Sequence, residues 1–232
     1  MPETPEMPAL PEIPALSEMQ ALPEIPALPD PLIISYMTLR KVIGFLGLFL
    51  VPVMVLGSLI LDHPPKIQIS VSAYYYTSMR NELEGIICGI SLFLLSYHGY
   101  SKQDSIVSKI AGLFALGIAF FPTSETAQKG DVLSILHYLT AGVFFAALSY
   151  MSIWLFTKSD GNKTEQKKKR NRVYRVCGVI MAVSVLGIPI DGIPAIHDKI
   201  IFLKPTLIFE TLALVSFGIS WLTKGEFILG DK

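Results

Sequence analysis

Six long apolar stretches, separated by short polar segments, cover most of the chain after residue 41. They are Val42–Leu61, Leu83–Tyr97, Ile106–Phe121, Val132–Thr157, Val176–Ile196 and Pro205–Leu222. An α-helix rises about 1.5 Å per residue, so about 20 apolar residues cross the hydrocarbon core of a bilayer. The pattern therefore predicts an all-α fold, a polytopic membrane bundle of six transmembrane helices. The second and third stretches are short and need flanking residues to complete a crossing.

The first 37 residues differ sharply from the apolar part of the chain. Residues 5–28 are four hexamers, PEMPAL, PEIPAL, SEMQAL and PEIPAL, and nine of the sixteen prolines lie in the first 31 residues. Proline at this density removes backbone donors and leaves polyproline II or disorder. We therefore predict a disordered, acidic, Pro-rich repeat tail over 1–37, followed by a transmembrane domain over 38–232. One glutamate per hexamer also allows an acidic docking strip for a partner.

The distribution of basic residues predicts the orientation. With the amino terminus inside, fourteen of the nineteen Lys and Arg residues fall on the cytoplasmic side, eight of them in residues 158–175. Cytoplasmic loops are enriched in Lys and Arg, so this arrangement is the favoured one. The prediction is a multi-pass protein of the cell (inner) membrane with both termini in the cytoplasm. The basic segment is interpreted as a topology signal, with an anionic-lipid patch as the alternative.

Composition limits the chemistry. The chain is 51% hydrophobic and only 16% charged, whereas soluble domains carry about a quarter charged residues. The two cysteines, Cys88 and Cys177, lie in apolar stretches without metal-ligand spacing, so no disulfide framework, metal site or cofactor is expected. No nucleic-acid module is present. The expected partners are the lipid bilayer and a small or lipid-like ligand, and a G-x-x-x-G at Gly85 and Gly89 leaves a homo-oligomer open.

Ionisable side chains inside the apolar stretches are the candidate site, because they are costly in a membrane and usually face protein or water. In the predicted topology His137, Asp191 and Glu210 each lie five residues from the outer end of a helix, on three different helices. They therefore reach one depth in the outer half of the membrane. We expect them to form an outward-facing polar pocket or, alternatively, a structural salt-bridge network.

The start of the second apolar stretch adds three more candidates at this level. Arg80 and Glu84 lie at or just above it, and Tyr75 precedes them by about one turn. Arg80 is expected above the three buried groups, where it offsets the acids or binds an anionic headgroup. The predicted ligand-binding residues are therefore Tyr75, Arg80, Glu84, His137, Asp191 and Glu210.

Three functions fit these residues. The first is binding or translocating a small or lipid-like ligand in the outward-facing cavity. The second is a membrane-embedded hydrolase acting on a lipid-like substrate, because Ser134 lies one turn before His137 and a Ser–His pair is conceivable. The third is a structural or accessory membrane subunit. The residues leave open whether the protein is an enzyme.

Three segments carry a resemblance to known proteins. SVSAYYYTSMRNELEGIICGISLFLLSYHGY with the following AGLFALGIAFFPT, and FETLALVSFGISWLTKGE near the end, resemble uncharacterised bacterial multi-pass integral membrane proteins of the domain-of-unknown-function type. The resemblance covers about residues 40–228 and implies a bacterial inner-membrane, multi-helix protein. A distant similarity to the alkaline-ceramidase superfamily is disfavoured, because that pattern needs a histidine pair on a late helix, where this chain has Glu210 and no histidine.

Overall fold

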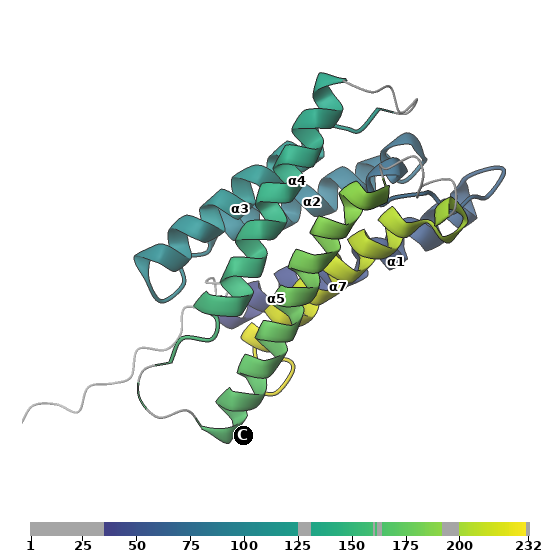
Figure 1. The fold of residues 1–232 in the computed structure, drawn as a ribbon. Coiled ribbons are helices and arrows are strands. Elements are labelled where there is room, and N and C mark those ends of the chain that lie inside the picture. Colours follow the sequence, from purple (N-terminus) through teal and green to yellow (C-terminus); the bar gives the residue numbers. More distant parts are fainter. Residues whose placement is uncertain (1–34, 125–130, 160, 162–163, 192–199, 231–232) are drawn as a thin grey trace, which may run out of the picture. The chain divides into compact units, whose positions relative to one another are not determined.

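The computed structural model describes residues 35–124, 131–159, 161, 164–191 and 200–230. Helices are the regular secondary structure in this part of the chain, as the sequence predicts (Figure 1). The long helices are α1 (Tyr36–Leu61), α2 (Arg80–Ser96), α3 (Lys102–Phe120), α4 (Val132–Tyr150), α5 (Glu165–Asp191) and α7 (Pro205–Lys224). Three short helices accompany them, at Ser72–Tyr76 (η1), Met151–Leu155 (η2, which prolongs α4) and Ile201–Leu203 (η3).

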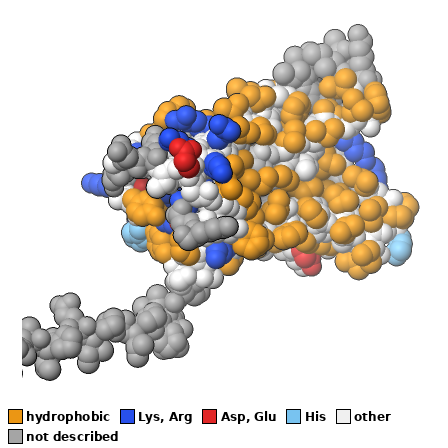
Figure 2. Space-filling view, turned by 90° about the horizontal axis from the view of Figure 1, so that it is seen from below, with side chains coloured by type: hydrophobic (Ala, Val, Ile, Leu, Met, Phe, Trp, Pro, Cys, Tyr) orange, Lys and Arg blue, Asp and Glu red, His pale blue; other side chains and the backbone are white. Residues whose placement is uncertain are grey.

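Within the described residues five helices, not the predicted six, are long and apolar enough to cross a membrane: α1, α3, α4 with η2, α5, and α7 with η3. The exception is α2, which has 17 residues. At the α-helical rise it spans about 25 Å, less than the roughly 30 Å of a hydrocarbon core. Hydrophobic side chains cover most of the visible face of the molecule, as expected for a multi-pass membrane protein (Figure 2).

The helices form a ring in chain order. Each of α1 to α5 packs against the next, α5 packs against α7, and α7 closes the ring against α1. The closing contact depends on glycines, because a side chain at Gly44 or Gly47 of α1 would overlap Leu222 and Phe217 of α7. A Cβ at Gly218 of α7 would in turn lie 2.8 Å from the backbone of α1. Small residues let helix backbones approach closely, so these positions hold the first and last helices together.

One half of the ring is filled by an aromatic cluster of Tyr97, Phe144, Phe156, Phe217 and Trp221. Trp221 lies at its centre, with ring centroids 5.0 Å from Tyr97 and 5.3 Å from Phe156. Phe217 of α7 contacts both Trp221 of the same helix and Phe144 of α4, on the other side of the helix ring. All five side chains are buried, so this half of the interior is closed by packed rings.

The basic segment differs from its prediction as a polar loop. Helix α5 begins at Glu165 and includes most of it, because Lys, Arg, Gln and Glu are good helix formers. An ion pair between Glu165 and Lys168, three residues apart, supports the first turn. The predicted tail lies outside the described residues except for its last three positions, and α1 already begins at Tyr36.

Candidate functional site

The ring encloses a pocket in the half that the aromatic cluster leaves open. Its empty space is about 740 Å³, including the part open to solvent. Apolar side chains from α1, α2, α3, α4 and α7 line most of it: Leu50, Leu83, Ile87, Ile90, Ile118, Phe144, Phe145 and Leu214. Polar side chains join them from η1, α2, α4 and α7: Ser72, Tyr75, Glu84, His137 and Glu210. Four of the six predicted site residues therefore line one pocket.

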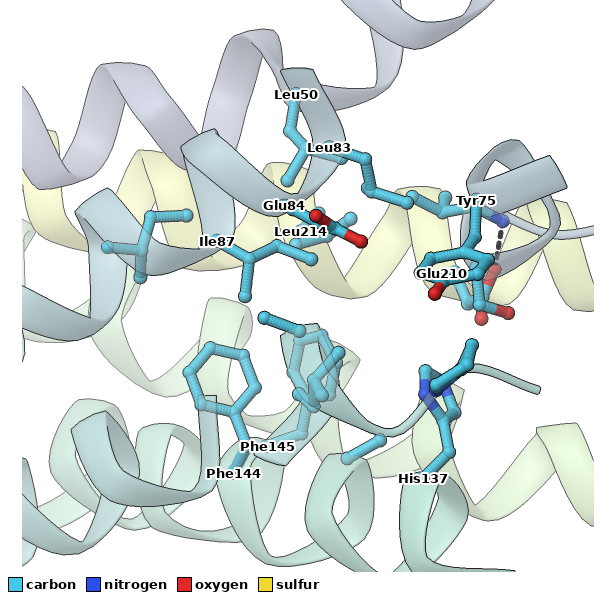
Figure 3. A pocket seen from close by; sticks show the side chains of 17 residues that line it. Leu50, Tyr75, Leu83, Glu84, Ile87, His137, Phe144, Phe145, Glu210 and Leu214 are labelled. Carbon is cyan, nitrogen blue, oxygen red and sulfur yellow. Dashed lines mark hydrogen bonds between the residues drawn. The ribbon is translucent and has the colours of Figure 1, made fainter. Parts of the chain in front are cut away.

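Glu210 and His137 come from different helices and lie at the same end of the pocket (Figure 3). The Glu210 carboxylate accepts a hydrogen bond from the backbone N–H of Val71, just before η1. The backbone also joins these elements, because Leu207 N–H donates to the Ile69 carbonyl at 3.1 Å. Glu210 thus has one oxygen engaged in holding the segment that covers this end of the pocket.

His137 is buried, and its Nδ1 lies 2.7 Å from the backbone carbonyl of Phe121. A carbonyl oxygen only accepts hydrogen bonds, so Nδ1 carries the hydrogen. This bond fixes the imidazole between the end of α3 and the pocket. Figure 3 shows the ring directed toward the pocket and Tyr75 beside Glu210 above it.

Arg80 pairs with a carboxylate of its own helix and not with the buried groups of the pocket. Its Nε lies 3.0 Å from a carboxylate oxygen of Glu84, one turn along the same helix, and its guanidinium lies 4.0 Å from the ring centroid of Tyr75. The side chain is half exposed and does not line the pocket. A carboxylate on the next turn is the nearer partner, so Arg80 forms the local pair and holds Tyr75 and Glu84 at the rim.

Asp191 is the last residue of α5, and its side chain lies outside the described part of the structure. Its participation in the pocket stays a prediction.

The Ser–His pair suggested by the sequence does not form. The hydroxyl of Ser134 lies 3.1 Å from Asp131 and accepts from the N–H of Ser124 at 2.7 Å, while His137 is bonded to Phe121. These contacts cap the start of α4, because the Asp131 carboxylate also accepts from the Ser134 N–H. Ser134 therefore has a local structural role.

Comparison with known proteins adds no identity: no protein-family model matches the chain, and neither curated proteins nor solved structures give a match. The resemblance to uncharacterised bacterial membrane proteins therefore stays a prediction.

The apolar part of the pocket was not foreseen. Phe144, Phe145 and Ile87 lie within continuous apolar runs, where nothing distinguishes a side chain that faces a pocket from one that faces lipid. Two adjacent phenylalanines in the middle of a predicted span were the one local signal, because bulky rings often fill space between helices.

Proposed function

We propose that this integral membrane protein binds a lipid-like ligand in the pocket, with the polar group of the ligand at the Glu210–His137 end. The observation that carries the proposal is the division of the lining. Tyr75, Glu84, His137 and Glu210 supply polar contacts, and two phenylalanines with aliphatic side chains line the rest. A mostly apolar pocket with a few polar groups is typical of ligand sites, and this pattern suits a polar headgroup followed by a hydrocarbon chain.

Binding is proposed rather than translocation. The pocket ends against Phe144, which belongs to the aromatic cluster, and the rings of Phe217 and Trp221 fill the ring of helices beyond it. A ligand passing through would have to separate several stacked side chains. The arrangement therefore supports a site that is entered and left at the same end.

We also propose the orientation with both termini in the cytoplasm and the pocket toward the outside of the inner membrane. The start of α1 meets the end of α7, where Arg40 donates to the Lys224 carbonyl. Just before α2, the Ser78 N–H donates to Asp62, the residue after the end of α1, at 3.0 Å. Just after α2, the ring of Tyr97 stacks on that of Tyr36 at the start of α1. We infer that α2 returns the chain across the membrane as a shorter sixth crossing.

The test is to fill the pocket and measure retained lipid. Ala141 of α4 lines the pocket, whereas Leu139, two residues earlier on the same helix, is exposed on the outer face. Full-length wild type, Ala141→Trp and Leu139→Trp would be purified in detergent, washed and extracted, and the bound lipids quantified by mass spectrometry.

The expected result is a lipid-like species retained by wild type and by Leu139→Trp and lost from Ala141→Trp. Glu210→Gln should change which headgroup is retained, because it removes the charge at the polar end. Equal lipid content in all folded variants would refute the proposal.

A further inference from the structure

A second cluster of charged side chains lies far from the pocket, at the opposite end of α7. It contains Arg40 from the first turns of α1 and Lys224 from the end of α7, both buried at 4% and 9% exposure. Glu210 and Lys224 are fourteen residues apart on one helix, which is about 21 Å. The two sites are therefore separate, with the aromatic cluster between them.

Arg40 has no carboxylate partner within the described residues. Its Nη1 makes three long polar contacts, to Met37 Sδ at 3.4 Å, to the Tyr100 hydroxyl at 3.5 Å and to the Lys224 carbonyl at 3.4 Å. The guanidinium also lies over three tyrosine rings, 5.1 to 5.8 Å from the centroids of Tyr36, Tyr97 and Tyr100. Its Nε is buried without a hydrogen-bond partner in that part of the chain. Leaving a buried charged donor without a hydrogen bond costs free energy, so a bound acceptor at this nitrogen would be stabilising.

Lys224 is likewise buried, and its ammonium faces aromatic rings. Its ammonium lies 4.7 Å from the ring centroid of Tyr100 and 5.1 Å from that of Phe156, and among the described residues no carboxylate forms an ion pair with it. Lys167 adds a further cation beside it, because its ammonium donates to the carbonyl of Phe156 at 2.9 Å, and the Phe156 ring faces Lys224. Positive charge is thus concentrated around two buried nitrogens.

Two carboxylates offset only part of this charge. Asp104 lies 3.7 Å from Lys158 and accepts backbone hydrogen bonds from Tyr100 and Ser101, and Glu226 pairs with Arg170 at 3.1 Å. Both acids therefore have partners already, and among the described residues neither forms an ion pair with Arg40 or Lys224. A concentration of positive charge with converging Arg and Lys donors is the usual environment of a bound phosphate group.

Tyr100 covers the two buried cations. Its ring is shared by Arg40 and Lys224, yet the residue is 78% exposed, so it can swing away without opening the core. Its backbone is held in place, because the Tyr36 hydroxyl accepts from His98 and Gly99 N–H groups on one side and Asp104 accepts on the other. The side chain of Tyr100 can therefore move while its backbone stays in place.

We propose that Arg40 and Lys224 form a binding site for a phosphate group, which displaces the Tyr100 ring and accepts from Arg40 Nε and the Lys224 ammonium. The exposed outer face of the neighbouring helices is apolar, and the site lies at the end of the predicted spans, where lipid phosphates are found. An anionic phospholipid headgroup therefore supplies this group, with a free phosphate ion as the other source of the same chemistry.

The experiment measures thermal stabilisation of the full-length protein in neutral detergent by three probes at equal ionic strength: dihexanoyl phosphatidylglycerol, dihexanoyl phosphatidylcholine and inorganic phosphate. The test variant is Arg40→Gln with Lys224→Gln. The control is Lys168→Gln with Lys169→Gln, which removes the same charge from two exposed positions on α5. Tyr100→Ala is a third variant, chosen because an exposed residue can be changed without loss of the fold.

Phosphatidylglycerol should stabilise wild type and control, and its apparent affinity should fall about tenfold or more in the double variant. Tyr100→Ala should bind it several-fold more tightly, because the competing ring is gone. Equal stabilisation by inorganic phosphate would identify the free ion as the occupant of the same site. The site is refuted if phosphatidylglycerol stabilises the double variant and the control equally, or if phosphatidylcholine stabilises wild type as much as phosphatidylglycerol does. If the double variant does not fold, the site is refuted when Tyr100→Ala binds phosphatidylglycerol with the same affinity as wild type.

Discussion

Replacing Trp221 with alanine should destabilise the protein by about 3 kcal/mol, whereas the same change at Trp154 should have little effect. The chain contains only these two tryptophans. Trp221 is 1% exposed at the centre of the aromatic cluster, and Trp154 is 56% exposed on the outer face of η2. The pair therefore compares one substitution in two environments within the same molecule.

The magnitude follows from the contacts of the Trp221 ring. It packs against Tyr97, Phe156 and Phe217 with centroid distances of 5.0, 5.3 and 6.3 Å. Each aromatic pair contributes about 0.5–1.5 kcal/mol, and removing a buried Trp or Phe from a core costs about 3–5 kcal/mol. The low end applies, because lipid offers an apolar side chain nearly the same transfer energy as a protein interior. Trp154 loses a single tilted contact, with Tyr150 at 5.2 Å.

The assay is unfolding by increasing mole fractions of sodium dodecyl sulfate in mixed micelles, followed by circular dichroism. Each variant also keeps one tryptophan, so its fluorescence reports that residue alone. Brominated lipid should quench Trp154 strongly in Trp221→Ala and quench Trp221 weakly in Trp154→Ala. A loss below about 1 kcal/mol for Trp221→Ala, or an equal loss for Trp154→Ala, would refute the buried aromatic cluster.

Three further predictions concern the loops and the topology. Gly99→Ala should lower the free energy of unfolding by about 1–2 kcal/mol, more than Gly161→Ala does. Both glycines have positive φ, but only at Gly99 would an added Cβ overlap a side chain, that of Asp104. Thermal melts of the two variants would therefore separate the effect of steric overlap from that of backbone strain. Hydrogen bonds from a serine hydroxyl and from a serine backbone N–H lower the pKa of Asp62, so it should stabilise the fold above the ordinary carboxyl pKa and lose this effect as pH falls through its lowered value. The melting temperature of Asp62→Asn should therefore decline less in acid, and an unchanged acid decline would count against these bonds. In a cysteine-free background, an impermeant thiol reagent should label a cysteine at position 127 but not at 165 in intact cells, and the reverse pattern would overturn the orientation.

The apolar pattern located the long helices well but placed their starts poorly. The predicted stretches begin at Val42, Ile106 and Val176, whereas α1, α3 and α5 begin six, four and eleven residues earlier. Hydropathy reports membrane depth, and a helix continues past the apolar region wherever polar helix formers and caps allow it. Ser35 and Ser101 each accept from a backbone N–H of the first turn, so capping rather than apolarity sets these ends.

For the candidate site, depth along the helices grouped residues that line one pocket, but the sequence did not show which groups would pair with each other. Counting residues from the span ends brought His137 and Glu210 to the same end of the pocket. The same reasoning did not identify the partner of Arg80, which is a carboxylate one turn away on its own helix. Arg40 and Lys224 entered the sequence analysis only among the fourteen cations counted on the cytoplasmic side. A sequence does not show that two helix ends, 184 residues apart, bury their cations beneath one tyrosine.

The closure of the ring by α7 against α1 has a consequence for biosynthesis. Gly44 and Gly47 of α1 enter the membrane early, but the helix that fits against them is translated last. Until α7 is inserted, this face of α1 has only lipid or a transient partner, and the chain must then join segments of very high sequence separation. Insertion can proceed helix by helix, yet assembly completes in one late step. A truncation before Pro205 should therefore leave inserted helices that never mature and that are removed by membrane quality control.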